Sequence, residues 1–265
     1  HPTGQWLASC CAKEVRVWDT ATGRCITVLP LTGTVLSVAW CPSIDVAILA
    51  IAVDSSLILM SPEQCGLLEQ SNALYTGSGA GTAASILKWR QDTNRVTIEH
   101  EHRIDQITWH HRGDYLACMC KTANTLAASI VMHQLSRRTS QQPFGRLPSG
   151  TPRSVAFAHQ RPYLLLATSQ HVRVYDLMSQ RLVKKLTPSV NNILHVASHP
   201  RSADNLIAAV GEKIAWFDCD LSSSPYKTLH THSANINSIA IHRTYPLFAT
   251  ASDDGTVQAF HGRVY

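Results

Sequence analysis

The sequence predicts an all-β fold assembled from repeated units of about 42 residues. Three observations lead to this prediction. A short strand pattern that ends in an aromatic residue and Asp recurs along the chain. A polar turn with His or Cys precedes each copy. Almost no segment shows the 3.6-residue periodicity of a helix. This combination is typical of a WD-repeat β-propeller, in which four short strands form each blade.

The recurring strand predicts the third strand of each blade. Its clearest copies are Val15–Asp19, Val172–Asp176 and Ile214–Asp218, and weaker copies begin at Leu57, Ile130 and Val257. Successive copies start 42 or 43 residues apart, except between Leu57 and Ile130, which are 73 apart. The longer gap predicts an insertion or long loop at about 61–95. Within it, the small-residue stretch Tyr75–Thr82 lacks the Gly-Lys-Ser/Thr ending of a phosphate loop, so we interpret it as a surface loop.

The polar turns separate the first strand of each unit from the second. An alternating run such as Ser154–Phe157 precedes the turn, and a run of small apolar residues such as Phe248–Ser252 follows it. Small residues suit a second strand that lies between two neighbouring sheets. The turns are marked by His1, Cys41, His110, His159, His199 and His242.

The two ends of the sequence fall inside units of the repeat. His1 lies in the turn after a missing first strand, and Tyr265 comes just after a third strand. We therefore expect residues 1–265 to form a partial WD-repeat β-propeller of about six blades with both end blades incomplete, from a parent fold of seven blades. We also expect this stretch alone not to close its ring. An ordinary antiparallel sandwich is the alternative, and the regular period disfavours it.

Composition limits the class of protein. The chain is 45% hydrophobic with a mean hydropathy of −0.05, and no apolar run reaches the roughly 18 residues of a membrane span. Eight cysteines without an Asn-x-Ser/Thr sequon favour a reducing compartment with buried thiols. We expect no metal and no cofactor: the Cys10-Cys11 pair and Cys118-Met119-Cys120 lack the two-residue spacer of zinc knuckles, and His230-Thr231-His232 has no evident third ligand.

Positive charge is concentrated in one part of the chain. The net charge is +5, but residues 133–185 hold nine basic side chains and only one acid, Asp176. This pattern fits contacts with an anionic partner such as RNA, and it fits a solvated surface equally well. Turns after first and third strands should share one face of the propeller. The candidate RNA contacts are Arg137, Arg138, Arg146, Arg161, Arg181, Lys184 and Lys185.

The sequence shows no catalytic constellation. Five of the 14 histidines recur at the repeat turns, so a structural role in those turns explains them. His232, Ser252 and Asp254 match the buried hydrogen-bond network that ties a blade together in WD-repeat proteins. Phe260 stands where the usual Trp of that network would be, so we expect the network to be incomplete.

Several segments resemble the carboxy-terminal propeller of the block-of-proliferation / Erb family of eukaryotic ribosome biogenesis WD-repeat proteins. The similarity is specific over about residues 103–265 and extends to residues 1–60 at the level of the repeat. The segments that carry it are His110–Tyr115, His133–Phe144, His171–Leu177, Leu182–Leu186, Trp216–Leu229, Tyr245–Val257 and Phe260–Tyr265.

This resemblance implies a non-catalytic scaffold of the nucleus and nucleolus, with the nucleoplasm as an alternative, needed for pre-rRNA processing and maturation of the large ribosomal subunit. It implies a pescadillo-type partner, bound through a part of the family outside this sequence, a second WD-repeat ribosome biogenesis protein, and pre-rRNA or the large-subunit precursor particle. No membrane partner is expected. Two alternatives stay open: a generic WD-repeat interaction scaffold of the ubiquitin-ligase or coat type, and an enzyme on a propeller scaffold.

Overall fold

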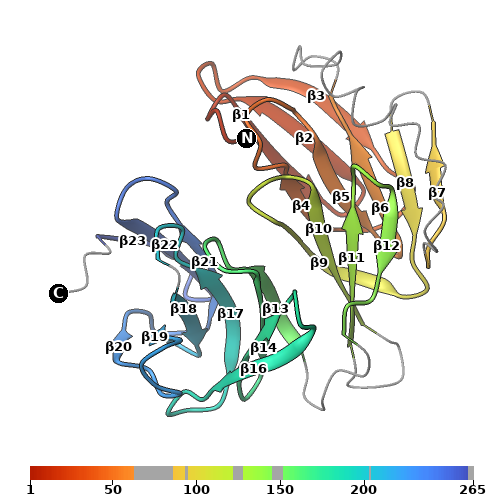
Figure 1. Ribbon diagram of the computed structural model, residues 1–265. Coiled ribbons are helices and arrows are strands. Elements are labelled where there is room, and N and C mark those ends of the chain that lie inside the picture. The colour runs from red at the N-terminus through yellow and green to blue at the C-terminus, as the bar shows by residue number, and fades with distance from the viewer. Residues whose placement is uncertain (63–85, 93–94, 122–127, 145–151, 203, 262–265) are drawn as a thin grey trace. The chain divides into compact units, whose positions relative to one another are not determined.

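The computed structural model describes residues 1–62, 86–92, 95–121, 128–144, 152–202 and 204–261. The chain divides into two compact units, His1–Gly145 and Arg146–Tyr265 (Figure 1). Every regular element in the described residues is a β-strand, and these strands form three antiparallel sheets in each unit. No helix that could span a membrane occurs in these residues. The predicted fold class, an all-β WD-repeat propeller with about six blades, is confirmed.

The first unit holds sheets of three, five and four strands, in the orders β1-β2-β3, β4-β5-β6-β8-β7 and β9-β10-β11-β12. Their bounds are β1 (Trp6–Cys11), β2 (Glu14–Asp19), β3 (Cys25–Pro30), β4 (Val35–Trp40), β5 (Leu49–Val53), β6 (Ser56–Met60), β7 (Trp89–Gln91), β8 (Arg95–Glu99), β9 (Arg103–Trp109), β10 (Tyr115–Lys121), β11 (Ala128–Gln134) and β12 (Thr139–Gln141).

The second unit holds sheets of four, four and three strands, each in chain order. Their bounds are β13 (Pro152–Phe157), β14 (Tyr163–Thr168), β15 (Val172–Asp176), β16 (Arg181–Leu186), β17 (Ile193–Ser198), β18 (Asn205–Val210), β19 (Lys213–Asp218), β20 (Lys227–His230), β21 (Ile236–Ile241), β22 (Leu247–Ser252) and β23 (Val257–His261). The six copies of the recurring sequence pattern fall on β2, β6, β11, β15, β19 and β23.

Sheets within a unit pack through their first strands. β4 contacts β9 in the first unit, and β17 contacts both β13 and β21 in the second. Two equivalent serines join these strands: Ser37 Oγ accepts the Ile107 N–H, and Ser154 Oγ accepts the Val196 N–H, both at 3.4 Å. Because neighbouring sheets cover both faces, strands such as β5 are buried at every residue rather than at alternate ones.

The Asp that ends the third strand caps the turn to the fourth. Asp19 Oδ1 accepts the N–H groups of Ala21 and Thr22 at 2.9 Å. Asp218 Oδ1 accepts those of Asp220 and Leu221 at 2.9 and 3.2 Å. A short carboxylate at this position therefore satisfies backbone donors that the strands leave unpaired.

The repeat histidines act in the same way in the turns between first and second strands. In four of these turns, Nδ1 of the histidine accepts the N–H of the residue two positions later: Thr3 for His1, Arg112 for His110, Arg201 for His199 and Thr244 for His242. The turn role predicted for these histidines is confirmed at these four positions.

The predicted insertion at about 61–95 contains one strand of the second sheet, β7, and β8 begins at its end. β8 pairs with β6 as the fourth strand, and β7 pairs with β8 as a fifth. The candidate loop Tyr75–Thr82 lies outside the described residues. The first and last sheets have three strands each, as expected for incomplete end blades. Closure of the ring involves both units and stays a prediction.

The expectation of buried thiols holds only in part. Cys41, Cys118 and Cys120 are buried, Cys219 is half-buried, and no disulfide joins the cysteines of the described residues. Cys10, Cys11 and Cys25, however, are exposed. They lie on the sheet β1-β2-β3, which has one neighbouring sheet within its unit, so its other face is open there.

Truncation of Phe217 should test how the second unit holds its core. This side chain is fully buried in the cluster that joins the sheets β13–β16 and β17–β20. We expect Phe217→Ala to lower the free energy of unfolding by about 3–5 kcal/mol, because it removes a large apolar side chain and leaves a cavity. Met178→Ala, at a residue that is 80% exposed, should change it little. Equal effects of the two in denaturant titrations would contradict this packing.

Candidate functional site

His232 is the centre of a buried polar network in the last sheet. Its Nδ1 lies 2.8 Å from Asp254 Oδ2, and its Nε2 lies 2.7 Å from Thr250 Oγ1. Asp254 also accepts the N–H of Ser233 at 3.2 Å and the hydroxyl of Thr256 at 2.6 Å. Donors from Thr256, His232 and the backbone together hold the pKa of Asp254 well below its usual range. The network joins the segment before β21, the strand β22 and the turn after it.

The structure brings two of the three predicted network residues into direct contact. Ser252 is a neighbour of the network rather than a partner of the imidazole: its hydroxyl donates to the Ala234 carbonyl and accepts the Asp254 N–H. The hydroxyl that meets His232 belongs to Thr250, which the sequence reasoning missed. Two residues apart on one strand, Thr250 and Ser252 point to the same side, so alternation alone did not distinguish them. Phe260 stacks on Phe248 with ring centroids 4.9 Å apart.

Loss of the Thr250 hydroxyl should destabilise the last sheet. Thr250 and His232 are both buried, so Thr250→Val would leave His232 Nε2 without its partner. We expect a decrease of about 1–3 kcal/mol in the free energy of unfolding. The matched control is Thr228→Val on the exposed side of β20, which should be near neutral. Identical stabilities of wild type and Thr250→Val in denaturant titrations would contradict this role.

Arg161, one of the predicted RNA contacts, is engaged by two acids. It donates from both terminal nitrogens to Asp220, at 3.1 and 2.7 Å, and forms an ion pair with Asp204 at 2.8 Å. Its guanidinium also lies over the Tyr163 ring, 5.8 Å from the centroid. The bond to Asp220 and the contact with Tyr163 raise the pKa of Arg161. Because Arg161 follows β13 while Asp204 and Asp220 belong to the next sheet, this cluster joins two blades.

Two other members of the predicted set, Lys184 and Arg138, are less available than the sequence indicates. Lys184 donates to the carbonyl of Cys219 across the same pair of sheets. Arg138 is half-buried in the turn between β11 and β12. Arg146 lies outside the described residues.

Arg181 and Lys185 on β16, and Arg137 in the turn before β12, are exposed. None of the three forms an ion pair within the described part of the chain. Lys185 pairs in register with Arg173 on β15, so two positive charges lie opposite each other. Their combined charge, added to the effect of burial, lowers the pKa of His171 nearby. Two of the three exposed, unpaired members of the predicted set therefore lie on strand β16.

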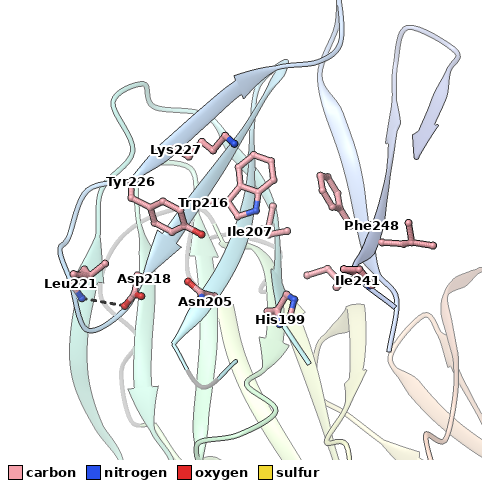
Figure 2. A pocket seen from close by; sticks show the side chains of 12 residues that line it. His199, Asn205, Ile207, Trp216, Asp218, Leu221, Tyr226, Lys227, Ile241 and Phe248 are labelled. Carbon is pink, nitrogen blue, oxygen red and sulfur yellow. Dashed lines mark hydrogen bonds between the residues drawn. The ribbon is translucent and has the colours of Figure 1, made fainter. Parts of the chain in front are cut away.

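A separate groove lies between the last two sheets of the second unit (Figure 2). It has a volume of about 570 Å³. Trp216, Ile207 and Phe248 form its apolar wall, while Asp218 and Tyr226 lie at its polar end. The Asp218 carboxylate already accepts hydrogen bonds from two N–H groups of its own turn. The described lining contains no Ser, Thr or Cys side chain.

The pH dependence of stability should include a contribution from His195 on β17. Burial lowers the pKa of His195, and its Nδ1 is buried without a hydrogen-bond partner in the described structure. As pH falls through about 6.5, the unfolded chain binds a proton that the folded chain resists. The stability that neutral His195 contributes is thus fully present above about pH 6.5. It declines as pH falls towards the lower pKa of the folded state, by at most about 1.4 kcal/mol per pH unit.

His195→Gln should therefore flatten the curve of melting temperature against pH between about pH 7 and 5. Other histidines with lowered pKa values, His171 and His199, would maintain part of the slope in both proteins. Parallel curves for the wild type and His195→Gln would show that His195 does not contribute.

The sheets, their capped turns and the His232 network define a WD-repeat β-propeller protein. The family model described as "WD domain, G-beta repeat" matches residues 1–19 and 223–261. Over its whole length, the chain is 38% identical to Ribosome biogenesis protein BOP1 of Homo sapiens. It is 37% identical, again over its whole length, to the BOP1 homolog of Culex quinquefasciatus, and 39% identical over 99% of its length to that of Chlamydomonas reinhardtii. These similarities confirm the resemblance of this chain to the BOP1 family of ribosome biogenesis proteins that the sequence indicated.

The chain spans only about a third of each of these relatives: 37% of the human protein, 32% of the Culex protein and 34% of the Chlamydomonas protein. The similarity therefore concerns the propeller region alone.

Proposed function

We propose that this chain is a non-catalytic scaffold in ribosome biogenesis, needed for pre-rRNA processing and maturation of the large ribosomal subunit. The observation that carries the proposal is similarity over the whole chain to proteins named for ribosome biogenesis. The fold supports a scaffold, because the conserved architecture of a WD propeller offers turns and edges for binding rather than a reactive cleft.

The second part of the proposal is contact with pre-rRNA through exposed basic residues, two on the sheet β13–β16 and one in the turn before β12. Arg181, Lys185 and Arg137 are the residues best placed for it, because they are exposed and form no ion pair in the described structure. Phosphate contacts relieve the repulsion between like charges such as Arg173 and Lys185. Arg161 is assigned instead to holding two blades together, since its guanidinium is already bound by two carboxylates.

The proposal extends to partners and location. We expect a second WD-repeat ribosome biogenesis protein and the large-subunit precursor particle as partners of this propeller. A pescadillo-type protein would bind a part of the full protein outside this sequence. Nucleolar location, with passage through the nucleoplasm, follows from such assembly.

A generic interaction scaffold is the second candidate. The groove in Figure 2 supports it, because exposed Leu221, Tyr226 and Leu247 provide an apolar surface of the kind that binds proteins. An interaction with a ubiquitin ligase or coat subunit in place of precursor ribosomes would favour this candidate.

The RNA proposal is tested by reversing charge at the three exposed positions in the full-length protein. The triple variant Arg137→Glu, Arg181→Glu, Lys185→Glu should bind precursor rRNA more weakly. The slope of log affinity against log salt should decrease by about 2 units, because roughly three phosphate contacts are lost. The tagged variant should also recover less pre-rRNA from nucleolar extracts.

The control is a second triple variant with the same change in net charge, at exposed basic residues outside the basic region: Lys13→Glu, Arg24→Glu, Lys88→Glu. Equal loss of binding in the two variants would show that net charge alone is responsible. If the wild-type protein recovers no large-subunit precursor at all, the scaffold proposal itself is contradicted.

A further inference from the structure

Two histidines and a cysteine meet in the interior of the first unit. His100 precedes β9, Cys118 lies on β10 and His133 on β11. All three are buried, and Cys118 and His133 are completely so. One ring nitrogen of each histidine and Sγ of Cys118 lie within 4.8 Å of one another.

This cluster occupies the positions of the hydrogen-bond network described above for the last sheet. His100 and His232 each lie four residues before an Ile that pairs with the second strand. Leu116 pairs with His133 just as Phe248 pairs with Phe260. Cys118, two residues after Leu116, therefore corresponds to Thr250, and His133 corresponds to Phe260. The sheet β9–β12 thus has a thiol where the last sheet has a hydroxyl, and an imidazole where the last sheet has an apolar ring.

Each histidine uses its Nδ1 and leaves its Nε2 without a partner. His133 Nδ1 lies 2.9 Å from Ser140 Oγ, and His100 Nδ1 lies 3.4 Å from Cys120 Sγ. The Nε2 atoms of both rings are buried and make no hydrogen bond in the described structure. A buried nitrogen without a partner is costly, so two of them in one cluster indicate a ligand.

The hydrogen bonds at Nδ1 suit metal binding. When Nδ1 of each ring carries the proton and donates it to Ser140 Oγ or Cys120 Sγ, Nε2 presents a lone pair.

We propose that His100, Cys118 and His133 bind a zinc ion inside the blade β9–β12. Two imidazoles and a thiolate are a ligand set that Zn²⁺ prefers. Zinc binding would release the thiol proton of Cys118 to solvent. Ligand atoms around a tetrahedral zinc are about 3.3–3.8 Å apart, so the cluster needs side-chain shifts of about an ångström. Three protein ligands leave the fourth position to water.

The surroundings support the proposal. Ser140 Oγ has two lone pairs, and it accepts from Trp89 Nε1 at 2.9 Å while lying 2.9 Å from His133 Nδ1. It can thereby fix the His133 tautomer that exposes Nε2, as outer partners of zinc-bound histidines do. A cavity of about 250 Å³, lined by His100, Cys120 and Gln142 among others, provides an entry path.

The spacing of the ligands explains why the sequence did not reveal them. Cys118 and Cys120 are separated by one residue, whereas zinc knuckles have a two-residue spacer, so their sequence pattern predicted no zinc site. Here the three ligands come from one loop and two strands, and Cys120 is not among them.

The proposal is tested by measuring metal in the full-length protein purified without chelators. We expect about one zinc per chain. Cobalt exchanged into the site should give the absorption of a thiolate-to-cobalt charge transfer. Cys118→Ser and His133→Phe should lose the metal, and Ser140→Ala should bind zinc about 10–100-fold more weakly. Cys41→Ser, at another buried cysteine of the same unit, is the matched control and should keep its zinc.

Two results would overturn the proposal. One is a folded wild-type protein that takes up no zinc or cobalt when loaded, or that binds cobalt without the thiolate band. The other is equal loss of metal in Cys41→Ser and Cys118→Ser. Because the wild-type measurement is decisive by itself, a Cys118→Ser protein that fails to fold does not prevent the test.

Discussion

The inner sheets of each unit have strands that are apolar on both faces, so they depend on neighbouring sheets to bury their core. β5 is buried at every residue, and β18 at all but its first. The apolar clusters lie between sheets: one joins β5 and β6 to β10 and β11, and another joins β14 and β15 to β18 and β19. Packing between blades therefore fixes the positions of the turns at the blade ends.

Those turns carry several charged side chains, and part of their charge is used for structure. The carboxylates at the ends of third strands cap backbone N–H groups, and Arg161 is held by Asp204 and Asp220 from the neighbouring blade. Some of the basic residues counted in the sequence are therefore not available to an anionic partner. Arg181 and Lys185 remain exposed on the edge strand β16.

Equivalent positions in different blades carry different chemistry on the same backbone. In the last sheet, His232 is satisfied by Thr250 and Asp254. In the sheet β9–β12, the corresponding histidine meets a thiol and a second imidazole. The fifth strand β7 adds Trp89, whose indole reaches Ser140 and the His133 ring. Strand β7 thus contacts the buried cluster, although the repeat pattern alone places it in an insertion.

The sequence by itself determined the fold class, the six third strands and the turn role of the repeat histidines, because these follow from short-range periodicity and from hydrogen bonds within a few residues. It also identified His232 and Asp254, because they match the hydrogen-bond network that ties a blade together in WD-repeat proteins. Only the tertiary structure decided that Thr250 rather than Ser252 meets His232, that Arg161 is paired, and that His100, Cys118 and His133 converge. Each of these depends on distances between side chains from different strands or blades, and such distances are set by packing across the sheets rather than by spacing along the chain.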